Sequence, residues 1–115
     1  MQVWGREESG KAVMVESGQR FNIELDSNPG TGYKWNWKLK PDPALIKLEE
    51  EFHRPRSGHR FLIGGGGRDV WTFKALESGY TALELEYRRP WENKPPQARF
   101  FLNITIINHS GRKEA

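Results

Sequence analysis

The sequence predicts an all-β domain, an immunoglobulin-like β-sandwich of seven to eight strands. Three observations support this fold class. Apolar and polar residues alternate over short runs, clusters of turn residues separate the runs, and no segment repeats its apolar residues with a helical period over a useful length. A closed barrel built from the same strands is the alternative.

Length and composition predict a single domain over residues 1–115, with a core from about residue 12 to 108 and a frayed tail over 110–115. The hydrophobic fraction of 36% and the five Trp residues suffice for one hydrophobic core. Nothing in the composition indicates more than a monomer.

Charge and cysteine content exclude several function classes. The net charge of +3 is spread along the chain, whereas nucleic-acid binding requires a dense basic patch. The chain has no cysteine, which excludes disulfides, a thiolate nucleophile and cysteine-based metal sites. No apolar run is long enough to span a membrane. Residues 1–7 lack the apolar segment of a signal peptide, so the sequence as it stands predicts a cytoplasmic protein, or a secreted or periplasmic one if a signal peptide has been removed.

The first half of the chain contains four predicted strands, at residues 12–15, 21–25, 33–39 and 44–48. The second strand is expected to face the core with Phe21, Ile23 and Leu25. The third strand is expected to do so with Tyr33, Trp35, Trp37 and Leu39. Two prolines within residues 41–43 break the chain before the fourth strand.

The second half begins with a long irregular segment, predicted from Phe52 to Arg68, in which residues 61–63 form a brief strand or a packed loop. Three strands follow, at residues 68–76, 80–87 and 99–108. Their alternate side chains are expected in the core: Trp71, Phe73, Ala75, Thr81, Leu83, Leu85, Tyr87, Phe100, Leu102, Ile104 and Ile106.

Between the second and third strands lies a loop with special backbone chemistry. Pro29 fixes its own φ and favours an extended conformation at Asn28. Gly30 and Gly32 allow backbone angles that are closed to other residues. Thr31 contributes the hydroxyl at the tip of the loop. Taken alone, this stretch is an ordinary inter-strand loop.

The order of turns and loops predicts three binding loops at one end of the sandwich. If successive strands are antiparallel, every second connection falls at the same end. The short turns at Gly18, residues 41–43 and residues 78–79 then share one end. Residues 28–32, the segment that ends at residues 64–67, and residues 88–96 share the other.

The composition of these loops favours binding over catalysis. Trp91 follows Pro90 in a loop, where it either folds back on the domain or awaits a partner, and Trp is enriched in interface hot spots. The histidines His53, His59 and His109 are isolated and lack the spacing of metal ligands. No serine lies in a nucleophile motif, and the glycine run lacks the residues that follow a phosphate loop. We therefore predict no enzyme activity, no metal and no cofactor.

Three loop motifs together resemble the chagasin family, the inhibitors of papain-like cysteine proteases. The first is Asn28-Pro29-Gly30-Thr31-Gly32-Tyr33, which is similar to the family's Asn-Pro-x-Thr-Gly-Tyr/Phe motif. The second is Gly64-Gly65-Gly66-Gly67, which is similar to its Gly-x-Gly-Gly motif. The third is Arg89-Pro90-Trp91, which is similar to its Arg-Pro-Trp/Phe motif. The motifs occur in the family's order, and the resemblance spans residues from about 12 to 108.

The resemblance implies a reversible, tight-binding inhibitor of papain-like, cathepsin L-type proteases that occludes the active-site cleft with a wedge of three loops. It implies that Thr31 lies near the catalytic Cys and His of the protease and that the other two loops grip its two sides. Gly30 departs from the family, whose members more often carry Thr, Ser or Ala there, so we expect altered affinity.

Two other readings remain open from the residues alone. One is an immunoglobulin-like adhesion or carbohydrate-binding module that uses the same loop end, although a single clear loop Trp disfavours sugar binding. The other is a structural domain whose loops have no function.

Overall fold

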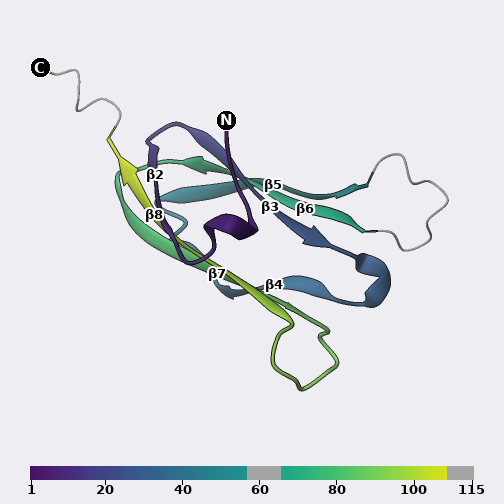
Figure 1. Ribbon diagram of the computed structural model, residues 1–115. Coiled ribbons are helices and arrows are strands. Elements are labelled where there is room, and N and C mark those ends of the chain that lie inside the picture. The colour runs from purple at the N-terminus through teal and green to yellow at the C-terminus, as the bar shows by residue number, and fades with distance from the viewer. Residues whose placement is uncertain (57–65, 109–115) are drawn as a thin grey trace, which may run out of the picture.

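Two four-stranded sheets pack face to face in the computed structural model, which describes residues 1–56 and 66–108 (Figure 1). One sheet has the order β1 (Gln2–Trp4), β3 (Arg20–Ser27), β6 (Gly67–Ala75), β5 (Ile46–Pro55). The other has the order β2 (Ala12–Glu16), β8 (Ala98–Ile107), β7 (Gly79–Arg88), β4 (Lys34–Leu39). Two separate sheets confirm the predicted sandwich rather than the barrel.

Two single turns of 3-10 helix interrupt the strands. The first, η1 (Arg6–Glu8), joins β1 to β2, and the second, η2 (Pro29–Thr31), lies between β3 and β4. Within the described residues no helix is long and apolar enough to cross a membrane.

The core is formed by the alternate side chains that the sequence pattern selects. Each sheet presents one face to the other, so side chains two residues apart along a strand enter the same interior. Phe21 is fully buried, and its ring centroid lies 4.8 Å from that of Trp4 and 5.4 Å from that of Phe73. The predicted core residues of β3, β6, β7 and β8 are all buried, which confirms that part of the prediction.

The strand β4 lies at an edge and is less buried than predicted. Trp35 and Trp37 are partly buried and pack against the core from this edge. The pairing with β7 shifts between Trp37 and Leu39, and Leu39 is 45% exposed. The expectation that Leu39 faces the core is therefore wrong, because the register shift breaks the alternation.

The irregular segment predicted from Phe52 to Arg68 is wrong at both of its ends. The strand β5 continues to Pro55, where it pairs with Gly67 of β6, and a bulge lies between Leu48 and Glu50. As an edge strand exposed over most of its length, β5 lacks the apolar alternation that would reveal it. The predicted brief strand at 61–63 and the frayed tail lie outside the described residues.

The N-terminal strand β1 is absent from the prediction. It has three residues, too few for an alternation to be visible, and it pairs in parallel with β3. Its Trp4 is buried at the edge of the core.

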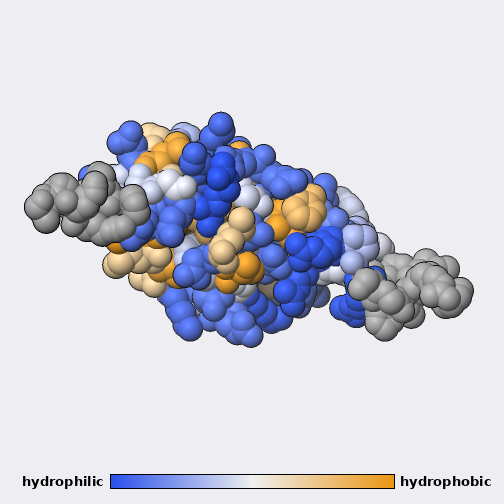
Figure 2. All heavy atoms as spheres, turned by 90° about the horizontal axis from the view of Figure 1, so that it is seen from above, coloured by the Kyte–Doolittle hydropathy of each residue, from blue (hydrophilic) through white to orange (hydrophobic). Residues whose placement is uncertain are grey.

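The two ends of the sandwich separate turns from loops, as the order of connections predicts. At the turn end (residues 17–19, 42–45 and 76–79), the amide of Gly18 donates to the carbonyl of Ala75 and that of Leu76 to the carbonyl of Leu45. The loop end carries the connections β3–β4, β5–β6 and β7–β8 (Figure 1). On the face seen in Figure 2, apolar side chains form small groups among hydrophilic ones.

Candidate functional site

The first loop (residues 28–33) is shaped by its own side chains. Asn28 is extended, with φ −137° and ψ 93°, as expected before proline, and its Oδ1 accepts a hydrogen bond from the amide of Gly30 at 3.2 Å. Thr31 Oγ1 donates to the carbonyl of Asn28 at 2.7 Å. Pro29, Gly30 and Thr31 are exposed on the resulting turn, η2. The loop therefore holds a compact shape without a partner.

The two glycines of this loop differ in their backbone. Gly32 ends η2 in the left-handed region, with φ 83°, and so uses the backbone freedom that glycine allows. Gly30 does not adopt a positive φ and so does not use this freedom.

The third loop (residues 89–97) is attached to the first through Arg89. Its Nε donates to the carbonyl of Thr31 at 2.9 Å, and its guanidinium carbon lies 4.5 Å from the ring centroid of Tyr33. A second donor, Nη1, reaches Oε2 of Glu92 at 3.2 Å. Since one side chain contacts both loops, the first and third loops form one unit.

Trp91 presents an exposed indole on this unit. Its side chain contacts Gly32 so closely that a Cβ on that glycine would overlap Cη2 of the indole. The residue is nevertheless 69% exposed. One edge of the indole therefore rests on the first loop, as the first alternative for Trp91 predicts, while most of the residue is exposed and a partner for it stays a prediction.

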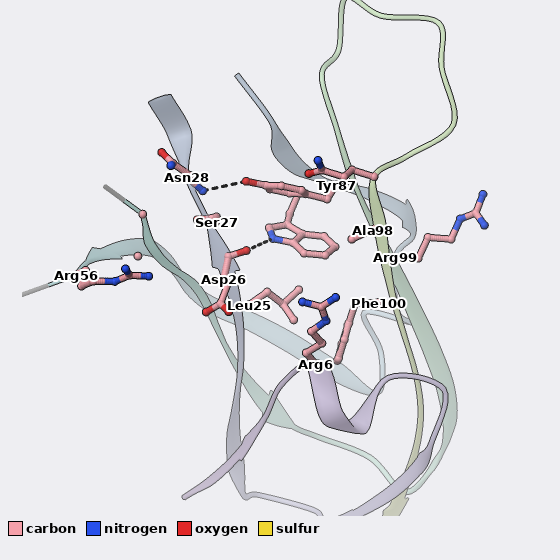
Figure 3. A pocket seen from close by; sticks show the side chains of 14 residues that line it. Arg6, Leu25, Asp26, Ser27, Asn28, Arg56, Tyr87, Ala98, Arg99 and Phe100 are labelled. Atoms are coloured by element: carbon pink, nitrogen blue, oxygen red, sulfur yellow. Dashed lines mark hydrogen bonds between the residues drawn. The ribbon is translucent and has the colours of Figure 1, made fainter. Parts of the chain in front are cut away.

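An aromatic column supports the first loop from below. The ring centroid of Tyr87 lies 5.3 Å from that of Tyr33 and 4.9 Å from that of Trp35. Tyr87 Oη accepts a hydrogen bond from the amide of Asn28 at 2.9 Å, and Trp35 Nε1 donates to the carbonyl of Asp26 at 3.1 Å (Figure 3). The alternation of their strands predicts only a core position for Tyr87 and Trp35. A signal for this further role is the polar group that each side chain carries near the end of its strand.

The sheets diverge at this end and leave a cavity of about 620 Å³ behind the first loop. Figure 3 shows Arg6 directed into this cavity beside Phe100, while Arg99 points away from it. The hydrogen bonds of Tyr87 and Trp35 hold the end of β3 and the start of the first loop beside this cavity.

The glycines of the second motif lie partly in a strand. Gly67 is buried at the start of β6, where a Cβ would overlap the carbonyl oxygen of Arg54. Gly66 lies in the second loop (residues 56–66), and a Cβ there would lie 2.8 Å from the carbonyl oxygen of Ser27. Both glycines therefore allow close backbone packing at the base of the loop. Gly64 and Gly65 lie outside the described residues.

A polar cluster that the sequence analysis missed lies beside this base. His53 Nδ1 is 2.8 Å from Oδ1 of Asp69 and 3.2 Å from Oγ of Ser27. These are the residue types of a hydrolase triad, but both partners contact the same ring nitrogen, whereas a relay requires one at each nitrogen. No group of metal ligands occurs among residues 1–56 and 66–108. With residues 52–68 predicted as irregular, no strand pairing brings His53 to Asp69, so the cluster is not predicted from the sequence.

The comparisons with known proteins agree with the three motifs. The family described as chagasin family peptidase inhibitor I42 matches residues 14–106. Chagasin from Trypanosoma cruzi is 31% identical over 87 residues, which cover 72% of this chain and 76% of that protein. Amoebiasin-2 from Entamoeba histolytica is 28% identical, over 76% of this chain and 69% of that protein.

Solved structures show the same fold. The cysteine protease inhibitor EhICP2 from Entamoeba histolytica superposes with a TM-score of 0.81 at 24% identity, covering 91% of this chain and 94% of that one. PbICP-C, solved in complex with falcipain-2, gives a TM-score of 0.66 at 17% identity, over 91% and 89% of the two chains. With its loop motifs in place and most of its length matched, the chain belongs to the chagasin family of peptidase inhibitors.

Proposed function

We propose that this protein inhibits papain-like cysteine proteases reversibly, by inserting its loop end into the active-site cleft. The observation that carries this proposal is the joining of two family motifs into one exposed unit by Arg89 and Trp91. The chain is an inhibitor rather than an enzyme, as the sequence predicts and as its family membership shows. That PbICP-C was solved in complex with falcipain-2 supports a protease of this class as the partner.

The conformation of the first loop explains how it enters a protease without being cut. Residues 29–31 form a 3-10 turn capped at one end by Asn28 and at the other by Gly32. Cleavage requires a peptide bond held in a near-attack geometry against the nucleophile. A tight turn fixed by internal hydrogen bonds does not offer such a bond, so the loop occupies the cleft and remains intact.

Each of the three loops is expected to contact a different part of the protease cleft. In this proposal Thr31, exposed at the tip, lies near the catalytic Cys and His of the protease, and Trp91 packs against one side of the cleft. The second loop, which includes Gly64, Gly65 and Gly66, contacts the other side. Because the first and third loops are already ordered by Arg89, little conformational entropy is lost on binding.

The experiment that tests this function is the titration of papain, and of a cathepsin L-type protease, with the purified protein while hydrolysis of a fluorogenic peptide is followed. We expect tight, reversible loss of activity and an inhibitor of unchanged mass. Trp91→Ala should raise the inhibition constant by about 30-fold or more, as for a hot-spot aromatic.

The matched control is Tyr80→Ala, which removes another exposed aromatic side chain, 63% exposed, at the turn end. It should leave the inhibition constant unchanged. No inhibition of either protease at micromolar protein would contradict the proposal and favour an immunoglobulin-like binding module instead.

A further inference from the structure

The inner face of one sheet changes from apolar to polar at the loop end. Along β3, the buried positions Phe21, Ile23 and Leu25 are followed by Ser27, which is only 7% exposed. Along β6, Trp71 is followed toward the loops by Asp69. His53 of β5 lies directly opposite Asp69 in the strand register. Polar groups in such positions are costly unless they bond to one another, and these three do.

The geometry assigns the proton of this cluster. A carboxylate only accepts hydrogen bonds, so the short 2.8 Å contact with Asp69 Oδ1 requires a hydrogen on His53 Nδ1. Ser27 Oγ, at 3.2 Å from the same nitrogen, is then a second acceptor of that hydrogen. The other ring nitrogen, Nε2, faces Gly67, where a Cβ would lie 2.9 Å from it. The imidazole is therefore seated against a glycine with Nδ1–H directed at both partners.

The three residues connect the first loop to the second. Ser27 is the last residue of β3 and is followed directly by Asn28, the cap of η2. His53 and Asp69 each lie two residues from the ends of their strands, Pro55 and Gly67, which lead into the second loop. A single imidazole thus joins the root of the first loop to the ends of β5 and β6.

We propose that His53 is a positioning residue of the inhibitory surface, whose Nδ1–H holds Ser27 to Asp69 and so sets the first loop relative to the ends of β5 and β6. This inference rests on the proposed function, because it concerns how that surface is held. Arg89 fixes the first loop to the third in the same way. Together the two side chains hold the first loop to the third loop and to the ends of β5 and β6.

The groups that surround His53 come from four strands. Asp69 faces the imidazole from β6, and Ser27 faces it from β3 without charge. Glu51 and Lys34 line the adjoining groove from β5 and β4. The side chains of Arg54 and Arg68 pair instead with Glu24. Among the described residues, the carboxylate within hydrogen-bond distance of the imidazole is therefore that of Asp69.

Two isosteric variants separate the hydrogen bond from packing. His53→Asn keeps an N–H donor near the position of Nδ1, whereas His53→Leu has the same shape and no donor. We expect His53→Leu to raise the inhibition constant by about tenfold and His53→Asn to stay within about threefold of the parent protein.

Equal inhibition by the parent protein and His53→Leu would overturn the inference. Equal weakening of both variants would also overturn it, because the imidazole would then act only by packing. Amide hydrogen exchange in the free protein gives a second readout that does not depend on inhibition. Faster exchange at residues 28–32 in His53→Leu, but not in His53→Asn, supports the brace even if the proposed function fails, and unchanged exchange refutes it.

Discussion

The turn end and the loop end of this sandwich differ in what lies beneath their connections. At the turn end, backbone hydrogen bonds and side-chain bonds from Ser17 and Thr81 close short connections over a core that contains Phe21 and Phe73. At the loop end, side chains of Tyr87, Arg89 and His53 bond to loop backbone or to residues near strand ends, in addition to the backbone hydrogen bonds within the loops. The turn end is therefore closed over a filled apolar core, whereas the loop end relies more on hydrogen bonds from individual side chains.

This difference implies that the residues that stabilise the fold are largely separate from those proposed to bind the protease. Apolar packing is strong but non-directional, so it stabilises the fold without fixing the position of an exposed loop. Hydrogen bonds are directional and fix loop shape, while each contributes little net stability. Substitutions at the two ends should therefore change different measured quantities.

The largest expected effect is on stability, from Phe21→Ala. The side chain is fully buried between Trp4 and Phe73, so its removal leaves a cavity and should lower the free energy of unfolding by about 3–5 kcal/mol. Urea denaturation measures this loss. The inhibition constant, corrected for the folded fraction, should not change. A large rise in the inhibition constant of the folded protein would show that the core near the turn end also determines inhibition.

The next largest effect is expected from Gly32→Ala, and it falls on inhibition. The φ of 83° strains any residue with a side chain, and the new Cβ would displace the indole of Trp91. We expect the inhibition constant to rise by about 30-fold, equivalent to about 2 kcal/mol of binding free energy.

Gly10→Ala is the matched control for that change. Gly10 has a similar φ of 86°, but a Cβ there meets nothing within 4 Å. It should show the loss of stability that comes from backbone strain without any change in inhibition. If Gly10→Ala weakened inhibition as much as Gly32→Ala, contact with Trp91 would not be the cause.

A smaller effect on inhibition is expected from Arg89→Lys, which keeps the positive charge and removes the planar guanidinium group. Lysine has no Nε donor for the carbonyl of Thr31 and stacks less well on Tyr33, so the inhibition constant should rise by about fivefold, or about 1 kcal/mol. Arg99→Lys, at a side chain that points away from the cavity behind the first loop (Figure 3), should have no effect. Equal inhibition by the parent protein and Arg89→Lys would show that the first and third loops hold together without this brace.

The smallest effect, and a favourable one, is expected from Gly30→Ala. Gly30 does not use a positive φ, so alanine can occupy this position and reduces the freedom of the unfolded chain. We expect a gain of about 0.4–1 kcal/mol in the free energy of unfolding. Thermal denaturation and the inhibition constant measure it, and potency should improve or stay equal. A lower melting temperature would show that the loop requires glycine here.

The sequence determined the fold class, the faces of the central strands and the family. Residues such as Leu83, Leu85 and Phe100 alternate with polar neighbours in the chain itself, so their burial follows from a local period of two. The order of the connections likewise predicted which loops share an end. These features could be predicted because neighbouring residues alone encode them.

Only the tertiary structure decided how the loops are held. The pairing of β5 with β6 gives His53 its partner, 16 residues away, and the packing of β7 under the first loop brings Tyr87 to Asn28, 59 residues away. Neither pair leaves a periodic signal, since β5 is an exposed edge strand and Tyr87 also satisfies the apolar pattern of its own strand. A period records which face of a strand is buried, whereas a hydrogen bond between distant residues depends on how the strands are finally placed beside one another.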